Sequence, residues 1–186
     1  MKNFAFLSGL SRQASAFRRD QKGMGAVEFA MLLPFMVALY FAAVETSQAV
    51  AIQRKVTLTA RAVADLASQT TSINNNDMTN MLTAASAVVA PFAAAELKVT
   101  VSAVNIDANG VAKVAWSDSL NGTKRAIGST VSLPTALNVP NAQLIWSEVN
   151  YHYVPTIGYL ITGALNLFEQ IYMRPRLSET VNRVNS

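Results

Sequence analysis

The sequence contains no cysteine and only one histidine, His152. Disulfide bonds and thiolate metal sites are therefore excluded, and a single imidazole is too few for a transition-metal site. No Walker loop, GxSxG motif or dinucleotide-binding glycine pattern occurs in the 186 residues. On a predicted strand, His152 shares a solvent-facing side with Glu148 and Asn150. We therefore expect no catalytic residue, no metal and no cofactor, and we do not expect the chain to be an enzyme.

Charged residues are also scarce, at 14% of the chain, and they are unevenly distributed. Residues 1–22 hold five basic residues and one acidic residue, which accounts for the whole net charge of +4. The rest of the chain is neutral, whereas nucleic-acid binding needs a basic face that replaces phosphate counterions. We therefore expect no nucleic-acid partner.

One long apolar run contributes much of the 51% hydrophobic content. Residues 23–44 contain a single charged residue, Glu28. As a helix they would extend roughly 33 Å, against about 30 Å of bilayer hydrocarbon. Arg18, Arg19 and Lys22 precede the run, which places the N-terminus in the cytoplasm and the remaining chain outside. The run predicts one membrane-spanning helix.

Three interpretations of this segment are open. A secretory signal would be cut after the apolar run, among the small residues of 40–51. A plain single-span anchor leaves Glu28 unexplained, because a buried carboxylate costs several kcal/mol unless it is neutralised, paired or able to reach the lipid headgroups. A prepilin leader would instead be cut before the apolar run.

The third interpretation fits specific residues. Gly23 ends the basic leader, four residues follow, and Glu28 and Phe29 open the apolar run. This order resembles the cleavage site of type IV prepilins of the Flp/Tad class. The apolar run resembles the start of TadE-like pseudopilins of the tight-adherence pilus system. Later segments resemble the same family: ARAVADLASQ (60–69), VAKVAW (111–116), EVNYHYVP (148–155) and YMRPR (172–176).

The resemblance implies a role in pilus assembly. A prepilin peptidase would cut between Gly23 and Met24, and the new amine of Met24 would pair with Glu28 of the same chain or of a neighbour, which lowers the cost of burying both charges. The protein would be a minor pilin or pseudopilin that primes or initiates assembly of a Tad/Flp pilus used in surface adherence, or that lies at the pilus tip. Its partners would be other pilins, the inner-membrane pilus platform and the lipid bilayer.

The same resemblance places the protein in the bacterial inner membrane, with a periplasmic head that can enter an extracellular pilus. The alternative is an uncut, membrane-anchored periplasmic protein that binds a ligand or assists envelope assembly. We assign no mechanism to the segment Arg174-Pro175-Arg176. We expect Trp116 and Trp146 to be core or subunit-contact residues.

The predicted fold is α+β and pilin-like, with a long N-terminal helix packed on a small, mostly antiparallel four-stranded sheet. The predicted regions are a leader (1–23), a transmembrane half-helix (24–44), an amphipathic outer half-helix (45–69) and a head (70–186). In the outer half, we expect one apolar face and one polar face. The apolar face is predicted to centre on Ala51, Leu58 and Ala62, flanked by Ile52, Val56, Val63 and Ala67; the polar face is predicted to hold Gln53, Thr57, Arg61 and Asp65, with Arg61 and Asp65 placed to pair.

Patterns in the head predict its elements. Asp77 is the expected N-cap of a short helix at 78–90, which ends before Pro91. Asn109-Gly110 indicates a hairpin turn. Strands are predicted at 97–106, 111–116, 144–154 and 168–174, with 117–142 as a long connection and 156–167 as a helix or loop.

The cleavage hypothesis predicts the mature N-terminus. If the peptidase cuts after Gly23, the protein isolated from its native host begins at Met24 and contains residues 24–186 of the sequence. N-terminal sequencing and intact-mass measurement check this directly. A mature chain that still begins at Met1 would contradict cleavage and favour the plain anchor.

Overall fold

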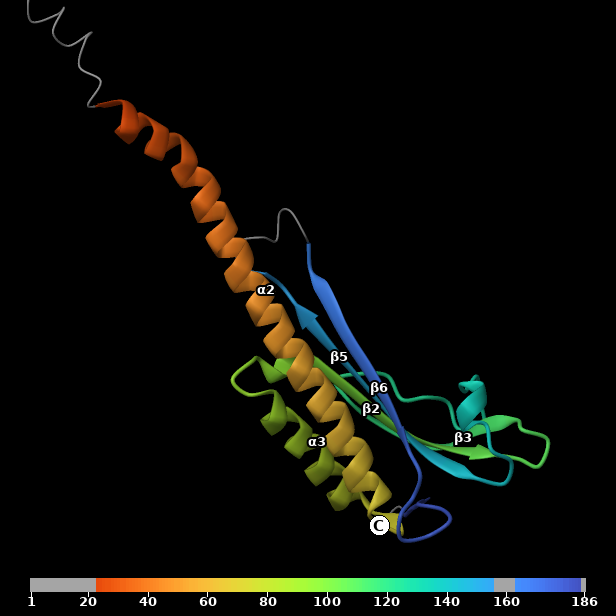
Figure 1. The fold of residues 1–186 in the computed structure, drawn as a ribbon. Coiled ribbons are helices and arrows are strands. Elements are labelled where there is room, and N and C mark those ends of the chain that lie inside the picture. Colours follow the sequence, from red (N-terminus) through yellow and green to blue (C-terminus); the bar gives the residue numbers. More distant parts are fainter. Residues whose placement is uncertain (1–22, 156–162, 185–186) are drawn as a thin grey trace, which may run out of the picture. The chain divides into compact units, whose positions relative to one another are not determined.

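The computed structural model describes residues 23–155 and 163–184 (Figure 1). Residues 1–22 of the predicted leader (1–23) and most of the segment 156–167 therefore lie outside the described residues. The chain divides into two compact units, Met1–Val44 and Glu45–Ser186, and each is described by itself.

The described part of the first unit is helical. Helix α2 (Met24–Ser68) begins at Met24 and continues through Pro34. Alanine, leucine and methionine, which favour helices, are frequent around the proline. The proline removes one backbone hydrogen bond, a loss that helices in lipid tolerate. Every residue from 24 to 44 is exposed, so the described part of this unit forms no core.

The second unit combines the rest of α2 with a sheet and a second helix. In chain order its elements are β1 (Ser72–Ile73), α3 (Asn75–Val89), η2 (Ala94–Glu96), β2 (Leu97–Ile106), β3 (Ala112–Leu120), β4 (Thr130–Val131), η3 (Thr135–Leu137), β5 (Gln143–Tyr153), β6 (Leu165–Met173) and β7 (Asn182–Arg183). Figure 1 shows α2 and α3 along the sheet. The α+β class with a long helix on an antiparallel sheet is confirmed.

The main sheet has five strands among the described residues, in the order β4-β3-β2-β5-β6, and all its pairs are antiparallel. The prediction of four strands was wrong. The fifth strand, β4, lies inside the segment predicted as a long connection, and it has only two residues. A two-residue strand has no alternation that a sequence pattern can reveal. It forms because the chain folds back on the start of β3, with which Thr130 and Val131 pair.

The β2–β3 hairpin follows the sequence pattern closely. β2 has the predicted bounds, and Gly110 takes a positive φ of 79° in the turn. The carboxylate of Asp107 accepts the backbone N–H groups of Asn109 and Val111, both at 2.9 Å. β3 extends to Leu120, whereas the prediction ended it at Trp116. The apolar alternation stops there because the buried residue Asp118 is held by ion pairs instead of apolar contacts.

Helix α3 begins earlier than predicted. Its N-cap is Asn74, whose side chain accepts the backbone N–H of Asp77 at 2.9 Å. Asp77 is the third helical residue and accepts the backbone N–H of Asn74 in return, at 3.2 Å. This reciprocal capping box satisfies two free donors of the first turn, which a cap at Asp77 would leave open. The predicted cap was therefore wrong by three residues, while the predicted end before Pro91 is confirmed.

The core lies between the helices and one face of the sheet, called here the inner face. Alternate residues of each strand reach it, as the period of two requires. Its fully buried side chains come from α2, α3, β2 and β5 and from the C-terminal segment: Ile52, Val56, Ala60, Val63, Ala67, Ala85, Val89, Leu97, Val99, Val101, Ile145, Val149 and Val181. A smaller cluster lies on the outer face: Val104, Ile106, Ala112, Leu144 and Trp146.

The C-terminal segment is tied into this core by polar contacts. The indole N–H of Trp116 donates to the carbonyl oxygen of Val181 at 2.8 Å, which confirms Trp116 as a core residue. The backbone N–H of Val181 donates to the Gln143 side chain at 2.6 Å. Beyond it, β7 pairs in parallel with β1. The last described residues therefore pack beside β1, the short strand between α2 and α3.

Asp118 joins three parts of the head. Its carboxylate accepts from Lys124 at 2.6 Å and from Arg183 of β7 at 2.8 Å. Burial raises the pKa of Asp118, but the hydrogen bonds and positive charges of Arg183 and Lys124 lower it by more, so the pKa lies below its usual value of 3.8. A group whose pKa is lowered by folding stabilises the protein above its unfolded pKa, and the contribution is lost as the pH falls.

We therefore predict that Asp118→Asn lowers the melting temperature at pH 6–7. The difference from the wild type should shrink as the pH falls below about 4, where the carboxyl of the unfolded chain becomes protonated, and should vanish once the pH is below the lowered pKa of the folded state. Thermal unfolding of the full chain in detergent, followed by circular dichroism between pH 7 and pH 3, measures this. Glu179→Gln, which removes an exposed carboxylate, is the control. An equal loss in both variants, or a difference independent of pH, would contradict the assignment.

Candidate functional site: the N-terminal helix

The predicted processing residues lie at the start of α2. Met24 is the first residue of the helix, and Gly23 directly precedes it. A side chain at Gly23 would meet no atom within 4 Å, so nothing in the described structure requires a glycine there. Recognition by another protein is one reason for a glycine that the fold does not need.

Glu28 lies four residues after Met24 in the same helix. Residues four apart face the same side of a helix, about one turn from each other. An amine created at Met24 would therefore lie within reach of the Glu28 carboxylate of its own chain. Phe29 is 58% exposed and lies on a neighbouring side of the helix.

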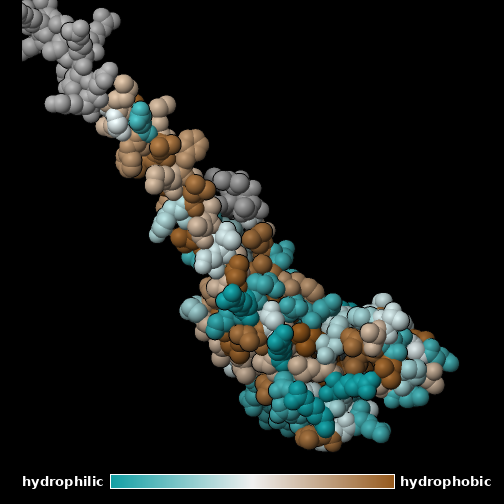
Figure 2. Space-filling model, viewed as in Figure 1, coloured by the Kyte–Doolittle hydropathy of each residue, from teal (hydrophilic) through white to brown (hydrophobic). Residues whose placement is uncertain are grey.

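The surface around these residues is almost entirely apolar. Residues 24–44 would span about 31 Å as a helix, close to the thickness of bilayer hydrocarbon. The helix is long and apolar enough to cross a membrane, and none of its most apolar stretch is buried within the structure. Figure 2 shows the apolar colours along this stretch of the helix. Its exposed large side chains include Val27, Met31, Leu32, Phe35, Met36, Leu39 and Tyr40.

The second part of α2 packs on the sheet, but on a different side from the predicted one. The buried stripe contains Ile52, Val56, Val63 and Ala67, which were predicted only as flanking positions. The predicted centre is turned away: Leu58 is 53% exposed, and Ala51 is also exposed. The prediction of the face was therefore wrong by part of a turn. Small residues, Thr59, Ala60 and Ala64, occupy the rest of the buried stripe, and their size lets the helix approach the strands closely.

The residues predicted as a polar face are divided between the sheet edge and solvent. Thr57 donates to the carboxylate of Glu169 on β6 at 2.9 Å, and Gln53 donates to the backbone carbonyl of Phe168 at 3.5 Å. These two side chains lie against the edge strand β6. An exposed strand edge offers unpaired backbone groups to other chains, and α2 satisfies one of them.

The predicted pairing of Arg61 with Asp65 was also wrong. The Asp65 carboxylate lies 2.8 Å from the guanidinium of Arg176, and the backbone N–H of Arg176 donates to the carbonyl of Ser68 at 2.8 Å. Arg176 therefore fastens the C-terminal segment to the end of α2. Both side chains are substantially exposed, so the ion pair itself adds little stability.

Among the described residues, no other element covers the outward side of α2 in the second unit. This side presents three exposed apolar side chains with two exposed arginines between them: Val50, Arg54, Leu58, Arg61 and Leu66. We call these five residues the outward stripe. Large apolar side chains that remain exposed in a row are typical of surfaces that contact another protein.

The remaining candidates from the sequence lie in the head. Val149, Tyr151 and Tyr153 are buried, while His152 lies on the other side of β5, as the alternation predicted. Its Nδ1 atom is 3.1 Å from the Asn166 side-chain oxygen. Among the described residues, no group of three His, Asp or Glu side chains could hold a metal ion.

Burial raises the pKa values of two tyrosines of β5. It raises the pKa of Tyr151, with a smaller opposite effect from a hydrogen bond to the Ala93 backbone, and it raises the pKa of Tyr153. Both phenols therefore stay neutral at physiological pH.

The sequence did not predict the ring stack on the outer face. Trp146 stacks on Tyr172 with ring centroids 5.3 Å apart, and the Arg125 guanidinium lies 3.8 Å from the centroid of the Trp146 ring. Arg125 also makes a bidentate ion pair with Glu148. Arg125 comes from the segment predicted as a connection, so no sequence spacing relates it to the strand residues. Trp146 is confirmed as buried.

This architecture defines a pilin-like α+β protein: a helix whose first part is apolar and exposed and whose second part packs on an antiparallel sheet. Residues 23–65 match the family model of TadE-like proteins, so the predicted TadE-like character is confirmed over α2. The match relates the chain to the Tad pilus system. It ends at Asp65, and the resemblance of the head segments stays a prediction. Comparisons with curated proteins and with solved structures found no match.

The corrected orientation of α2 predicts opposite outcomes for two neighbouring positions. Val56→Ala should destabilise the head by about 2 kcal/mol, because it removes buried methyl groups and leaves a cavity. Leu58→Ala should change stability by less than about 0.5 kcal/mol, because the side chain is half exposed. Denaturant unfolding of the full chain in detergent measures both. A larger loss for Leu58→Ala than for Val56→Ala would restore the orientation predicted from the sequence.

Proposed function

We propose that the protein is a minor pilin or pseudopilin that serves assembly of a Tad/Flp-type pilus and catalyses nothing itself. The observation that carries this proposal is the start of α2. The helix begins at Met24, directly after Gly23, and Glu28 is the single charge in a stretch of exposed apolar residues that is long enough to cross a bilayer. A plain anchor has no need of that carboxylate, whose burial in lipid is costly.

A prepilin peptidase would process the chain between Gly23 and Met24. Three observations support this site. The glycine is not required by packing, the helix begins at the next residue, and the TadE-like match begins at residue 23. The chemistry of the system then belongs to the peptidase, and the chain is its substrate.

The apolar part of α2 would lie in the inner membrane. The basic residues before it, Arg18, Arg19 and Lys22, favour a cytoplasmic N-terminus and a periplasmic head. In lipid, Glu28 is best stabilised by a nearby cation. The amine of Met24 is the nearest group that can supply one, either from the same helix or from an adjacent subunit.

Assembly would use both parts of α2. The apolar part supplies contacts between helices within the membrane, and the outward stripe supplies exposed apolar side chains on the part of α2 that packs on the head. Arg54 and Arg61 on that stripe favour pilin partners with acidic groups at matching positions. The large head, which the resemblance associates with priming, initiation or the tip, distinguishes such a subunit from the short major pilin.

The proposal predicts that Glu28→Ala impairs piliation much more than membrane insertion. Insertion depends on the apolar residues, and the variant removes the one group that costs free energy in lipid. Assembly depends on the charge pair, and Glu28→Gln, which keeps the shape and loses the charge, should fail in the same way. Electron microscopy of pili and immunoblots of the membrane fraction in the native host measure the two effects.

Glu179→Ala, an exposed carboxylate of the head, is the matched control and should leave pili normal. Normal piliation in Glu28→Ala would contradict the role of Glu28. Equal loss of protein from the membrane fraction and of pili would show that the residue acts in insertion and not in assembly.

The alternative function is an uncut, anchored periplasmic protein that binds a ligand. The polar hollow on the outer sheet face, described below, is the observation that favours it. The two functions differ in the mature N-terminus, since an anchor keeps residues 1–23 and a pilin loses them.

A further inference from the structure

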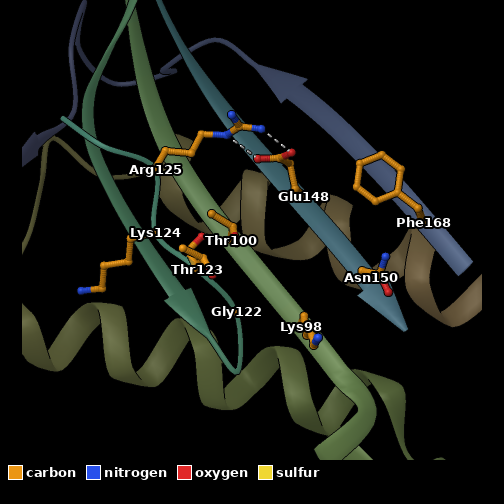
Figure 3. A pocket seen from close by; sticks show the side chains of 9 residues that line it. All are labelled: Lys98, Thr100, Gly122, Thr123, Lys124, Arg125, Glu148, Asn150 and Phe168. Carbon is orange, nitrogen blue, oxygen red and sulfur yellow. Dashed lines mark hydrogen bonds and ion pairs between the residues drawn. The ribbon is translucent and has the colours of Figure 1, made fainter. Parts of the chain in front are cut away.

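The outer face of the sheet contains a hollow of about 350 Å³ (Figure 3). This volume lies at the lower end of the range of ligand pockets, about 300–1,000 Å³. β2, β5 and β6 form its floor and one side, and the loop after β3 forms the other side. Its lining residues are Lys98, Thr100, Gly122, Thr123, Lys124, Arg125, Glu148, Asn150 and Phe168.

Three of these side chains form one row across three strands. Lys98 pairs in register with Asn150, and Asn150 pairs with Phe168. Adjacent strands are about 4.8 Å apart, so the row spans about 10 Å. It presents an ammonium group, an amide and an aromatic ring side by side on one face of the sheet.

The groups of this row are free to bind. In the described parts of the chain, neither the Lys98 amine nor the Asn150 amide has a hydrogen-bond or ion-pair partner. Phe168 is 48% exposed, which is high for an aromatic ring beside a concave surface. The row therefore offers several donors, one carbonyl acceptor and an apolar ring face to a ligand.

The other charges of the hollow are already neutralised. Arg125 holds Glu148 with two hydrogen bonds of 2.8 and 2.7 Å, and Figure 3 shows this pair at one end of the hollow. Lys124 is bound to Asp118 and points away from Phe168. Lys98 therefore determines the sign of the open charge, and the hollow favours an anion.

The loop after β3, which forms one side of the hollow, is held in place by its own hydrogen bonds without a ligand. Asn121 takes a positive φ of 53°, and its side chain donates to the Leu97 carbonyl at 3.0 Å. The Ser119 hydroxyl donates to the Gly122 carbonyl at 3.0 Å. A side chain at Gly122 would approach Thr100 and Lys98 at 3.5 and 3.8 Å, so the loop lies close over β2. A wall fixed by the fold reduces the ordering cost of binding.

We propose that this hollow binds a sugar residue that carries a carboxylate, as part of an acidic polysaccharide. The C–H face of a pyranose packs on the ring of Phe168, the hydroxyls bond the Asn150 amide and the threonines of the hollow, and Lys98 pairs with the carboxylate. The inference rests on the head alone and is independent of the pilus function.

An extended peptide fits the hollow less well. Peptides that add to a sheet use the free backbone groups of an edge strand. Of the strands that line the hollow, β2 and β5 are paired on each side, so their backbone groups are occupied. On the edge strand β6, the backbone carbonyl of Phe168 accepts a hydrogen bond from Gln53 of α2. A nucleic acid would need several free cations along its phosphates, and the row supplies one.

Titration of the full chain in a non-ionic detergent with tri-galacturonate tests the proposal. The fully methyl-esterified trisaccharide, which has the same rings and no charge, is the matched ligand control. Saturable binding of tri-galacturonate is expected, weaker by about fivefold or more for the ester and weakened by added salt, because Lys98 is exposed. Calorimetry or chemical-shift changes of the backbone amides give the dissociation constants.

Variants of the row residues test whether the ligand binds at the row. Lys98→Gln and Phe168→Ala should each weaken binding by about fivefold or more, the loss expected for one good contact. Lys113→Gln removes an exposed lysine outside the hollow, and Leu165→Ala removes an exposed apolar side chain of β6 outside it; both should leave binding unchanged. Circular dichroism verifies that each variant is folded, which is expected because Lys98 and Phe168 are exposed.

Four outcomes would overturn the proposal. They are no saturable binding of tri-galacturonate, equal binding of the methyl ester, unchanged binding in both Lys98→Gln and Phe168→Ala, and tighter binding of a tri-glutamate peptide than of the sugar. None of them bears on cleavage after Gly23 or on the role of Glu28.

Discussion

The packing of α2 on the inner face of the sheet is the interaction on which the rest of the head depends. A stripe of valine, isoleucine and alanine side chains along the helix is removed from water together with the facing residues of β2 and β5. α3 covers part of the same face and contributes Met78, Met81, Leu82, Ala85 and Val89 to the same core. Apolar burial of this kind supplies most of the free energy that opposes the conformational entropy of the chain. Ala60, Ala64 and Ala67 are buried in the same stripe of α2 as the valines.

That packing also determines which surfaces remain available. Once one side of α2 is buried, its other side carries the outward stripe, and the apolar residues from 24 to 44 stay exposed in the described structure. A helix that is apolar all round requires a membrane or other helices to cover it. Glu28 is then the one group in this stretch whose free energy depends strongly on what lies beside it. The proposed pilin function follows from these two facts together.

The outer face of the sheet is divided in a similar way. One end is covered, because the segment around β4 and η3 places Val131, Leu133 and Leu137 on the small outer cluster. The other end is left open, and there the strands present two polar side chains, Lys98 and Asn150, beside the exposed ring of Phe168. The Arg125–Glu148 pair and the Trp146–Tyr172 stack lie between the two ends and make the boundary rigid. The head therefore carries a structured polar surface that its core does not require.

Much of this protein follows from its sequence alone. The apolar run, the isolated carboxylate at Glu28 and the glycine before Met24 are local features, and they sufficed to predict a TadE-like helix. The bounds of β2, the turn at Gly110 and the alternation of β5 were also predictable, because strand period and turn chemistry act between neighbours in the chain. The N-cap of α3 was predicted three residues too late, because Asn and Asp are about equally good caps and residue type alone does not separate Asn74 from Asp77.

Other features were decided only by the tertiary structure. The buried side of α2 depends on where the sheet lies, and because its apolar residues surround much of the helix, periodicity could not select between Leu58 and Val56. Asp65 forms an ion pair with Arg176, and Asp118 forms one with Arg183. The partners are far apart in the sequence, and no local pattern encodes such pairs. β4, the Arg125–Trp146 contact and the row from Lys98 to Phe168 likewise arise from strand order and register. The sequence by itself determined the helix and its membrane character, because these depend on neighbouring residues, whereas the head's ion pairs and its hollow exist only once distant strands are brought together.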